Sequence, residues 1–216
     1  MLATQEQVNS FIAKFHQGTK LSYRKGEYII RPGETPSSVF YIEKGLVKAY
    51  DISKYGEENL LIVRKSHEVF PLIWAITGLE RNIIYQAMDD VVIWRVSRED
   101  YLKELQGDPT LLPPLLDMVT EMYRIHSERI ISLEYRTVRE RVISFLLTMA
   151  KRFGRVTDKG VLIEVPLRHQ DIASSVNSSR ETSSRELSRL EREGHIKNNQ
   201  STITLCDVKK FQALLG

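Results

Sequence analysis

The stretch from Arg180 to Arg192 carries side chains whose types and spacing could do chemistry. At about 100° per residue, a helix here has a polar side with Glu181, Arg185, Ser188 and Arg192 and an apolar side with Ser183, Leu187 and Leu190. Arg180 flanks the polar side at its N-terminal end. Arginine can bind guanine O6 and N7 with two hydrogen bonds, and glutamate can accept from cytosine N4. The polar side could therefore contact base edges in a DNA major groove.

The residues before this helix decide between that interpretation and a plainer one. Alone, Glu181 and Arg185 are typical of a solvated helix pair worth a few tenths of a kcal/mol. However, Ala173 is small enough for a close helix crossing, Asn177 tolerates a left-handed backbone, and Ser179 can cap the next helix. These signals predict two helices, over 168–176 and 179–193, joined by a tight turn, and they favour DNA recognition.

The surrounding elements predict a winged helix-turn-helix. A helix is expected over 137–153, with Gly154 as its stop, followed by a strand over 161–166. The segment 195–205 predicts a hairpin, and a short helix follows from Asp207. From Val138 onward the chain has 14 Lys and Arg against 9 Asp and Glu, whereas the remainder has 17 against 19. The basic end is the part suited to a polyanion.

The N-terminal half has a different pattern. Residues 1–20 predict a helix, and short apolar runs between Leu21 and Val96 alternate with turn signals, which is typical of a β-barrel or sandwich. Ser97 is the expected N-cap of a short helix through Leu105. The chain as a whole is therefore expected to be α+β.

A long helix is expected between these halves, from about Leu111 to Glu134, after a break at Asp108-Pro109. Spacings of three and four residues suggest a dimerisation stripe formed by Leu115, Val119, Met122, His126 and Leu133. The alternative is a helix that only covers its own domain. We place the domains at 1–107, 108–136 (helix and hinge) and 137–216.

Composition excludes several classes of protein. A single cysteine, Cys206, allows no internal disulfide and no cysteine-rich metal site, and a small packed side chain is expected there rather than a redox sensor. The sequence shows no metal-ligand cluster, no Gly-rich phosphate loop and no nucleophile–base pair that would indicate an enzyme. No apolar run reaches the roughly 18 residues of a membrane span, and no secretion signal is evident, so a cytoplasmic location without membrane attachment is expected.

Nearly the whole chain resembles the Crp/Fnr superfamily. The segment 166–196 resembles its DNA-binding end, with Arg180-Glu181-Thr182-x-x-Arg185 close to the Crp-like pattern and Ser184-Arg185 matching the Fnr-like Glu-x-x-Ser-Arg. Residues 23–50 resemble the start of its cyclic-nucleotide-binding-type β-roll, with Gly26, Pro32-Gly33-Glu34 and Tyr41-Ile42-x-x-Gly45. The 108–134 helix is similar to its dimerisation helix, and Arg139-Glu140-Arg141-Val142 to the start of its DNA-binding domain.

The resemblance implies a set of DNA contacts. Base contacts are expected from Arg180, Glu181, Ser184 and Arg185, and backbone contacts from His169, Gln170, Ser179, Thr182, Ser188 and Arg189. The sequence departs from the family pattern at Arg168, where a Ser or Thr cap is usual, and at Ser178, where an apolar residue is usual. Both departures are expected to loosen the first turns of their helices.

The family's nucleotide-binding members have a Gly-Glu-Leu turn and an arginine that pairs with the cyclic phosphate. Here Phe70-Pro71-Leu72-Ile73 replaces the turn, Pro71 lacks an amide donor, and only Arg81 in a different register could replace the arginine. We therefore expect no binding of cAMP and no cofactor. Trp74, Ile83 and Tyr85 could line an apolar effector pocket or fill a core, and His67 with His16 or His126 is a weaker candidate for haem ligation.

The function expected from these features is a sequence-specific transcription regulator. It would act as a homodimer on palindromic double-stranded DNA, with RNA polymerase and an unidentified small molecule as candidate partners. The alternative is a small-molecule- or haem-sensing module whose DNA binding is effector-dependent or degenerate.

Overall fold

A computed structural model describes residues 1–199 and 202–215. Its contacts divide the chain into two compact units, Met1–Asp51 with Leu61–Tyr123, and Ile52–Leu60 with Arg124–Gly216.

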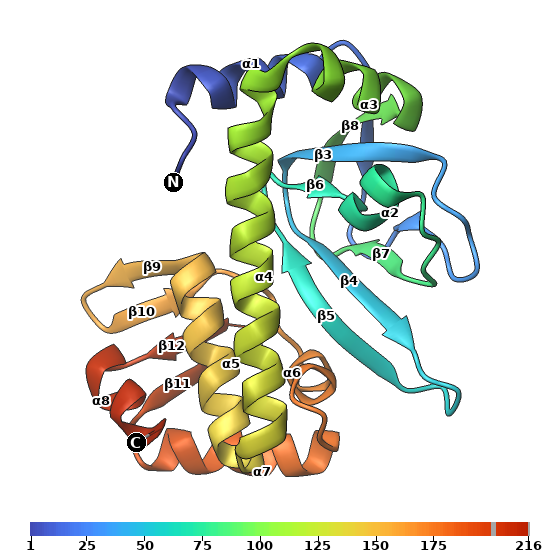
Figure 1. The fold of residues 1–216 in the computed structure, drawn as a ribbon. Coiled ribbons are helices and arrows are strands. Elements are labelled where there is room, and N and C mark those ends of the chain that lie inside the picture. The colour runs from blue at the N-terminus through green and yellow to red at the C-terminus, as the bar shows by residue number, and fades with distance from the viewer. Residues whose placement is uncertain (200–201, 216) are drawn as a thin grey trace. The chain divides into compact units, whose positions relative to one another are not determined.

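The first unit is built on two four-stranded sheets (Figure 1). One has the order β1 (Thr19–Tyr23), β8 (Val91–Ser97), β3 (Ser38–Lys44) and β6 (Val69–Phe70). The other has the order β2 (Tyr28–Ile30), β7 (Ile84–Ala87), β4 (Val47–Ile52) and β5 (Glu58–Arg64), whose first residues belong to the second unit. Sequential strands cross between the sheets, which confirms the predicted β-roll.

Helices close one end of this roll. They are α1 (Gln5–Phe15), α2 (Leu72–Thr77), α3 (Arg98–Gly107), the 3₁₀ turn η1 (Pro109–Leu111) and the first half of α4 (Leu112–Tyr135). Ser97 caps α3 by accepting from the Asp100 N–H, as predicted. Phe15 stacks on Tyr41 at 5.3 Å between ring centroids. The buried aromatic and aliphatic side chains of α1, α3 and α4 thus form one core with β3.

The structure divides the predicted stripe of α4 between two sides of the helix. Leu115 is only 8% exposed, and Met122 packs against the same core, so both face the β-roll of their own chain. His126 and Leu133 are half-buried. Val119 is exposed, and it shares its side with Leu112, Leu116 and Tyr123 at spacings of four, three and four residues. The apolar stripe left for a partner therefore keeps the predicted Val119 and adds Leu112, Leu116 and Tyr123, which the sequence interpretation did not select.

The candidate effector residues have separate packing partners. Tyr85 is buried and stacks on Phe70 at 4.7 Å, while Trp74 packs against the α1–α3 core and receives the Arg98 guanidinium over its ring. Ile83 is half-buried before β7. The structure therefore supports packed side chains at Trp74 and Tyr85 rather than one common pocket.

The candidate haem ligands also have protein partners. The Nδ1 atom of His67 lies 2.6 Å from the Tyr41 hydroxyl, and the His16 ring contacts Trp94 at 4.7 Å between centroids. Cys206 directly follows the last strand and is half-buried.

The second unit contains α5 (Val138–Phe153), α6 (His169–Ser175), α7 (Arg180–Arg192), α8 (Val208–Gln212) and the 3₁₀ turn η2 (Ala213–Leu215). Its sheet has the order β11 (Ile196–Asn199), β12 (Thr202–Leu205), β10 (Gly160–Ile163) and β9 (Gly154–Thr157). β11 and β12 pair antiparallel and form the wing; the turn of the predicted hairpin, residues 200–201, lies outside the described residues. The predicted winged helix-turn-helix is confirmed.

Candidate nucleic-acid interface

The turn between α6 and α7 has the predicted conformation. Asn177 adopts a φ of 49°, in the left-handed region that asparagine tolerates better than most residues. The Ser178 N–H then donates to the Ala173 carbonyl at 3.0 Å. Ile172, Ala173 and Val176 are buried, so α6 packs closely under α7. The recognition helix α7 is therefore placed by local sequence signals.

The expected weakness at the start of α6 does not occur. Arg168 is the N-cap, and the buried Asp171 carboxylate accepts from its backbone N–H at 2.9 Å. The same carboxylate accepts from Arg168 Nε at 3.1 Å and Nη2 at 3.0 Å. A bidentate guanidinium–carboxylate pair thus replaces the usual hydroxyl cap. The expectation that Arg168 loosens this turn was wrong.

Ser179 caps α7 as predicted. Its hydroxyl oxygen accepts from the Thr182 N–H at 3.1 Å, and its O–H lies 3.0 Å from Thr182 Oγ1. Arg185 Nη2 donates to the same Thr182 oxygen at 3.2 Å, so its guanidinium lies against the first turn. The pKa of Glu181 is lowered, first by its own backbone N–H and then by Ser179 and the neighbouring arginines. Glu181 is therefore ionised at neutral pH and can accept a hydrogen bond.

The side chains of α7 divide as the helix geometry predicted. Leu187 and Leu190 are fully buried together with Ser183. The exposed residues are Arg180, Glu181, Arg185, Ser188, Arg189, Glu191 and Arg192, and Ser184 is half-buried. We call Glu181, Arg185, Ser188 and Arg192, with Arg180 at the tip, the exposed face of α7. This face presents cationic, anionic and hydroxyl groups together.

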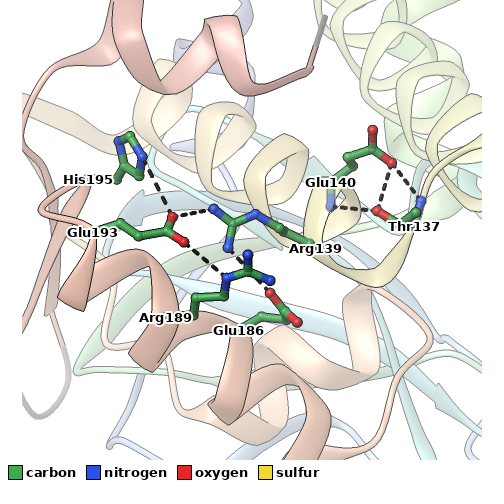
Figure 2. A network of polar contacts seen from close by, with 7 residues as sticks. All are labelled: Thr137, Arg139, Glu140, Glu186, Arg189, Glu193 and His195. Atoms are coloured by element: carbon green, nitrogen blue, oxygen red, sulfur yellow. Dashed lines mark hydrogen bonds and ion pairs between the residues drawn. The ribbon is translucent and has the colours of Figure 1, made fainter.

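One flank of α7 is fixed to α5 by charged side chains that the sequence interpretation missed (Figure 2). Arg139 Nη1 lies 3.5 Å from Glu186 Oε2, and Arg139 Nη2 is bonded to Glu193 Oε2. Glu193 also accepts from Arg189 Nε at 3.0 Å, and His195 Nε2 lies 3.7 Å from it. We call these five residues the Arg139 network. Arg189, a predicted backbone contact, thus has a protein partner.

The opposite flank is fixed to the wing. Glu191 accepts from the Asn198 N–H at 2.9 Å. Asn198 Nδ2 lies 3.2 Å from the Nε2 atom of His169, another predicted backbone contact. Gln170 is exposed at the start of α6. Both flanks of α7 therefore contact neighbouring elements of the second unit, and among its described residues the exposed face is left open.

Residues 1–199 and 202–215 contain no helix long and apolar enough to traverse a bilayer. Over the same residues, no group of three or more His, Cys, Asp or Glu side chains is arranged to hold a metal ion.

Comparison with known proteins agrees with this geometry. Residues 140–214 match the Crp-like helix-turn-helix domain, and residues 20–108 match the cyclic nucleotide-binding domain. Fold and site together define a DNA-binding transcription regulator with a sensor-type β-roll. The chain belongs to the Crp/Fnr superfamily.

Individual relatives are similar over most of their length. The global nitrogen regulator of Synechococcus elongatus is 28% identical over 185 residues, covering 85% of this chain and 83% of that protein. The transcriptional activator protein FnrA of Stutzerimonas stutzeri is 24% identical, covering 89% and 79%. The structure of FixK2 from Bradyrhizobium japonicum superimposes with a TM-score of 0.79 at 25% identity, covering 92% of this chain and 98% of that one.

Proposed function

We propose that this regulator binds an inverted repeat as a homodimer and recognises each half-site through Arg180, Glu181, Ser184 and Arg185. The observation that carries the proposal is the exposed face of α7, whose five side chains are all exposed in the part of the chain that the structure describes. Recognition helices place their N-terminal turns against base edges. Arginine and glutamate there favour G·C pairs in each half-site.

Backbone contacts are assigned to the residues around the start of the two helices. Gln170, Ser179 and Thr182 present polar groups beside the exposed face, and Ser188 belongs to that face. His169 and Arg189 complete the set if they exchange their present partners for phosphate oxygens. Such contacts position the protein without selecting sequence.

Dimerisation through α4 is supported by its exposed stripe of Leu112, Leu116, Val119 and Tyr123. Tyr123 is 74% exposed in the single chain. Spacings of four and three residues are those of a coiled-coil seam. A two-fold dimer would place two copies of α7 in successive major grooves, about 34 Å apart.

We propose that cAMP does not control this protein. Pro71 is the N-cap of α2, where it has no N–H to donate to a phosphate, and Arg81 is exposed. An unidentified effector and RNA polymerase are the further partners that we assign. The protein is proposed to act without enzymatic activity in the cytoplasm, where its DNA lies. An ordered exposed face on α7 counts against the alternative of a sensing module with degenerate DNA binding.

The test is a binding selection from random duplex DNA with the full-length protein. We expect an inverted repeat with G·C pairs in each arm and half-site centres about 10 base pairs apart or a multiple of that spacing. The variant Arg180→Ala/Arg185→Ala, whose changes are confined to exposed side chains, is the matched control and should return no repeat. A wild-type selection without an inverted repeat would refute the proposal. Added cAMP should leave the unfolding temperature unchanged.

A further inference from the structure

Arg139 lies at the second position of α5, immediately after the break between α4 and α5. Helix α4 ends at Tyr135, and Thr137 and Glu140 form a capping box that starts α5 (Figure 2). The Thr137 N–H donates to Glu140 Oε2 at 2.8 Å. This box fixes the first turn of α5 and so fixes where the Arg139 guanidinium projects.

The two carboxylates that Arg139 contacts lie on one flank of α7. Glu186 and Glu193 are separated by seven residues, which is two helical turns, or about 10.5 Å along the axis. Arg139 and Glu186 are half-buried, with side-chain exposures of 22% and 23%, whereas Glu193 at the end of the helix is exposed. The Arg139–Glu186 contact is therefore screened less by water than an exposed ion pair is.

A bridge across two turns restrains motion that one contact would allow. A single ion pair lets a helix rotate about the contact. Two contacts at different positions along the helix axis oppose both rotation of the helix and sliding along its axis. Sliding by one residue moves α7 by about 1.5 Å, nearly half of the roughly 3.4 Å between base pairs. It also moves Arg180 and Arg185 away from the edges that they would contact.

We propose that Arg139 is a positioning residue that sets the register of α7 in the major groove by bridging Glu186 and Glu193. The inference rests on the proposed DNA-binding function and adds to it a residue outside the helix-turn-helix. Arg139 does not contact DNA in this scheme. Because it follows the α4–α5 break directly, a change in the direction of α5 there moves the recognition helix with it.

The experiment measures specificity separately from stability. Full-length wild type, Arg139→Ala, Arg139→Lys and Glu186→Gln are titrated by fluorescence anisotropy against two duplexes of equal length and composition. One carries the inverted repeat from the selection, and the other carries the same bases scrambled. Arg155→Ala is the matched control, because Arg155 pairs with Glu164 in the same unit and neither residue belongs to α7 or to the Arg139 network. Thermal unfolding defines the temperature at which each variant is folded.

For Arg139→Ala we expect the ratio of the two dissociation constants to fall roughly tenfold, the value of one good base contact. Affinity for the scrambled duplex should stay within about twofold, since phosphate contacts do not depend on register. Arg139→Lys should not restore the ratio, because one ammonium group cannot span both carboxylates. Glu186→Gln should lower the ratio as well, and should have no further effect on top of Arg139→Ala.

The outcomes separate the two proposals. A folded Arg139→Ala with the wild-type ratio overturns the inference, and so does a fall in unfolding temperature alone. If Arg139→Ala does not fold, Glu186→Gln decides, because it keeps the arginine and the side-chain shape. If wild type itself shows no difference between the duplexes, the proposed function fails, and the inference fails with it.

Discussion

Ser183 offers a test of how α7 packs. Its side chain is fully buried on the inner side of the helix, and Oγ has no hydrogen-bond partner among the residues that the structure describes. A buried hydroxyl without a partner costs about 1–3 kcal/mol. Alanine also has the higher helix propensity, by about 0.5 kcal/mol. The oxygen also makes packing contacts that alanine lacks, and their loss offsets part of this gain. Ser183→Ala should therefore stabilise the protein by about 1–2 kcal/mol.

The measurement is denaturant unfolding together with the midpoint of thermal unfolding. A gain of 1–2 kcal/mol corresponds to a rise of about 2–8 °C for a chain of this size. The exposed Ser188→Ala on the same helix is the control, since it has the propensity gain without the buried hydroxyl. The difference between the two variants isolates the buried group. If Ser183→Ala is destabilising, or matches Ser188→Ala, the hydroxyl has a partner and the packing argument is incorrect.

Four further predictions follow from the site. Arg185→Ala should cost about 1–3 kcal/mol of specific binding and relax preference at one base pair, as a repeated selection would reveal; equal loss on all sequences would contradict base contact. Tyr123→Asp should give a folded monomer in sedimentation, because the side chain is exposed; a persistent dimer would exclude this stripe as the seam. Asn177→Val should destabilise by about 1–3 kcal/mol through its positive φ, with Asn177→Gly nearly neutral. Arg139, and then Arg189, lower the pKa of Glu193 below 4.5, so its stabilising effect is complete above pH 4.5 and is lost as pH falls through the lowered value. Glu193→Gln should reduce the fall in the free energy of unfolding that occurs as the pH is lowered.

The DNA-binding end was predictable because its signals are local. Asn177 marks the turn, Ser179 caps the helix that follows it, and Leu187 and Leu190 lie on one side at helical spacing. Each signal acts within a few residues of the backbone that it shapes. A single sequence is sufficient for features of this kind.

Features that depend on distant neighbours were not predictable in the same way. Helix α4 has apolar residues on two sides, so spacing alone cannot tell which side meets its own β-roll; the structure assigns Leu115 and Met122 to the core and leaves Leu116 and Tyr123 exposed. Trp74 and Tyr85 looked like one apolar group, but they pack in different places. The seven-residue spacing of Glu186 and Glu193 was visible, but their partner Arg139 lies more than forty residues earlier.

The two departures from the family pattern show how this chain meets the same physical requirement with different residues. The start of α6 needs a partner for backbone N–H groups, and Asp171 supplies it while its charge is balanced by the Arg168 guanidinium. Ser178 contributes its backbone N–H to the Ala173 carbonyl, so the turn does not depend on an apolar side chain there. Since α6 and the turn are satisfied internally, and the Arg139 network and Glu191 occupy both flanks of α7, the exposed face is the side of the helix that we propose to meet the bases. In the proposed mode of binding, the chemistry of that face selects the base pairs and the Arg139 network sets its register in the groove.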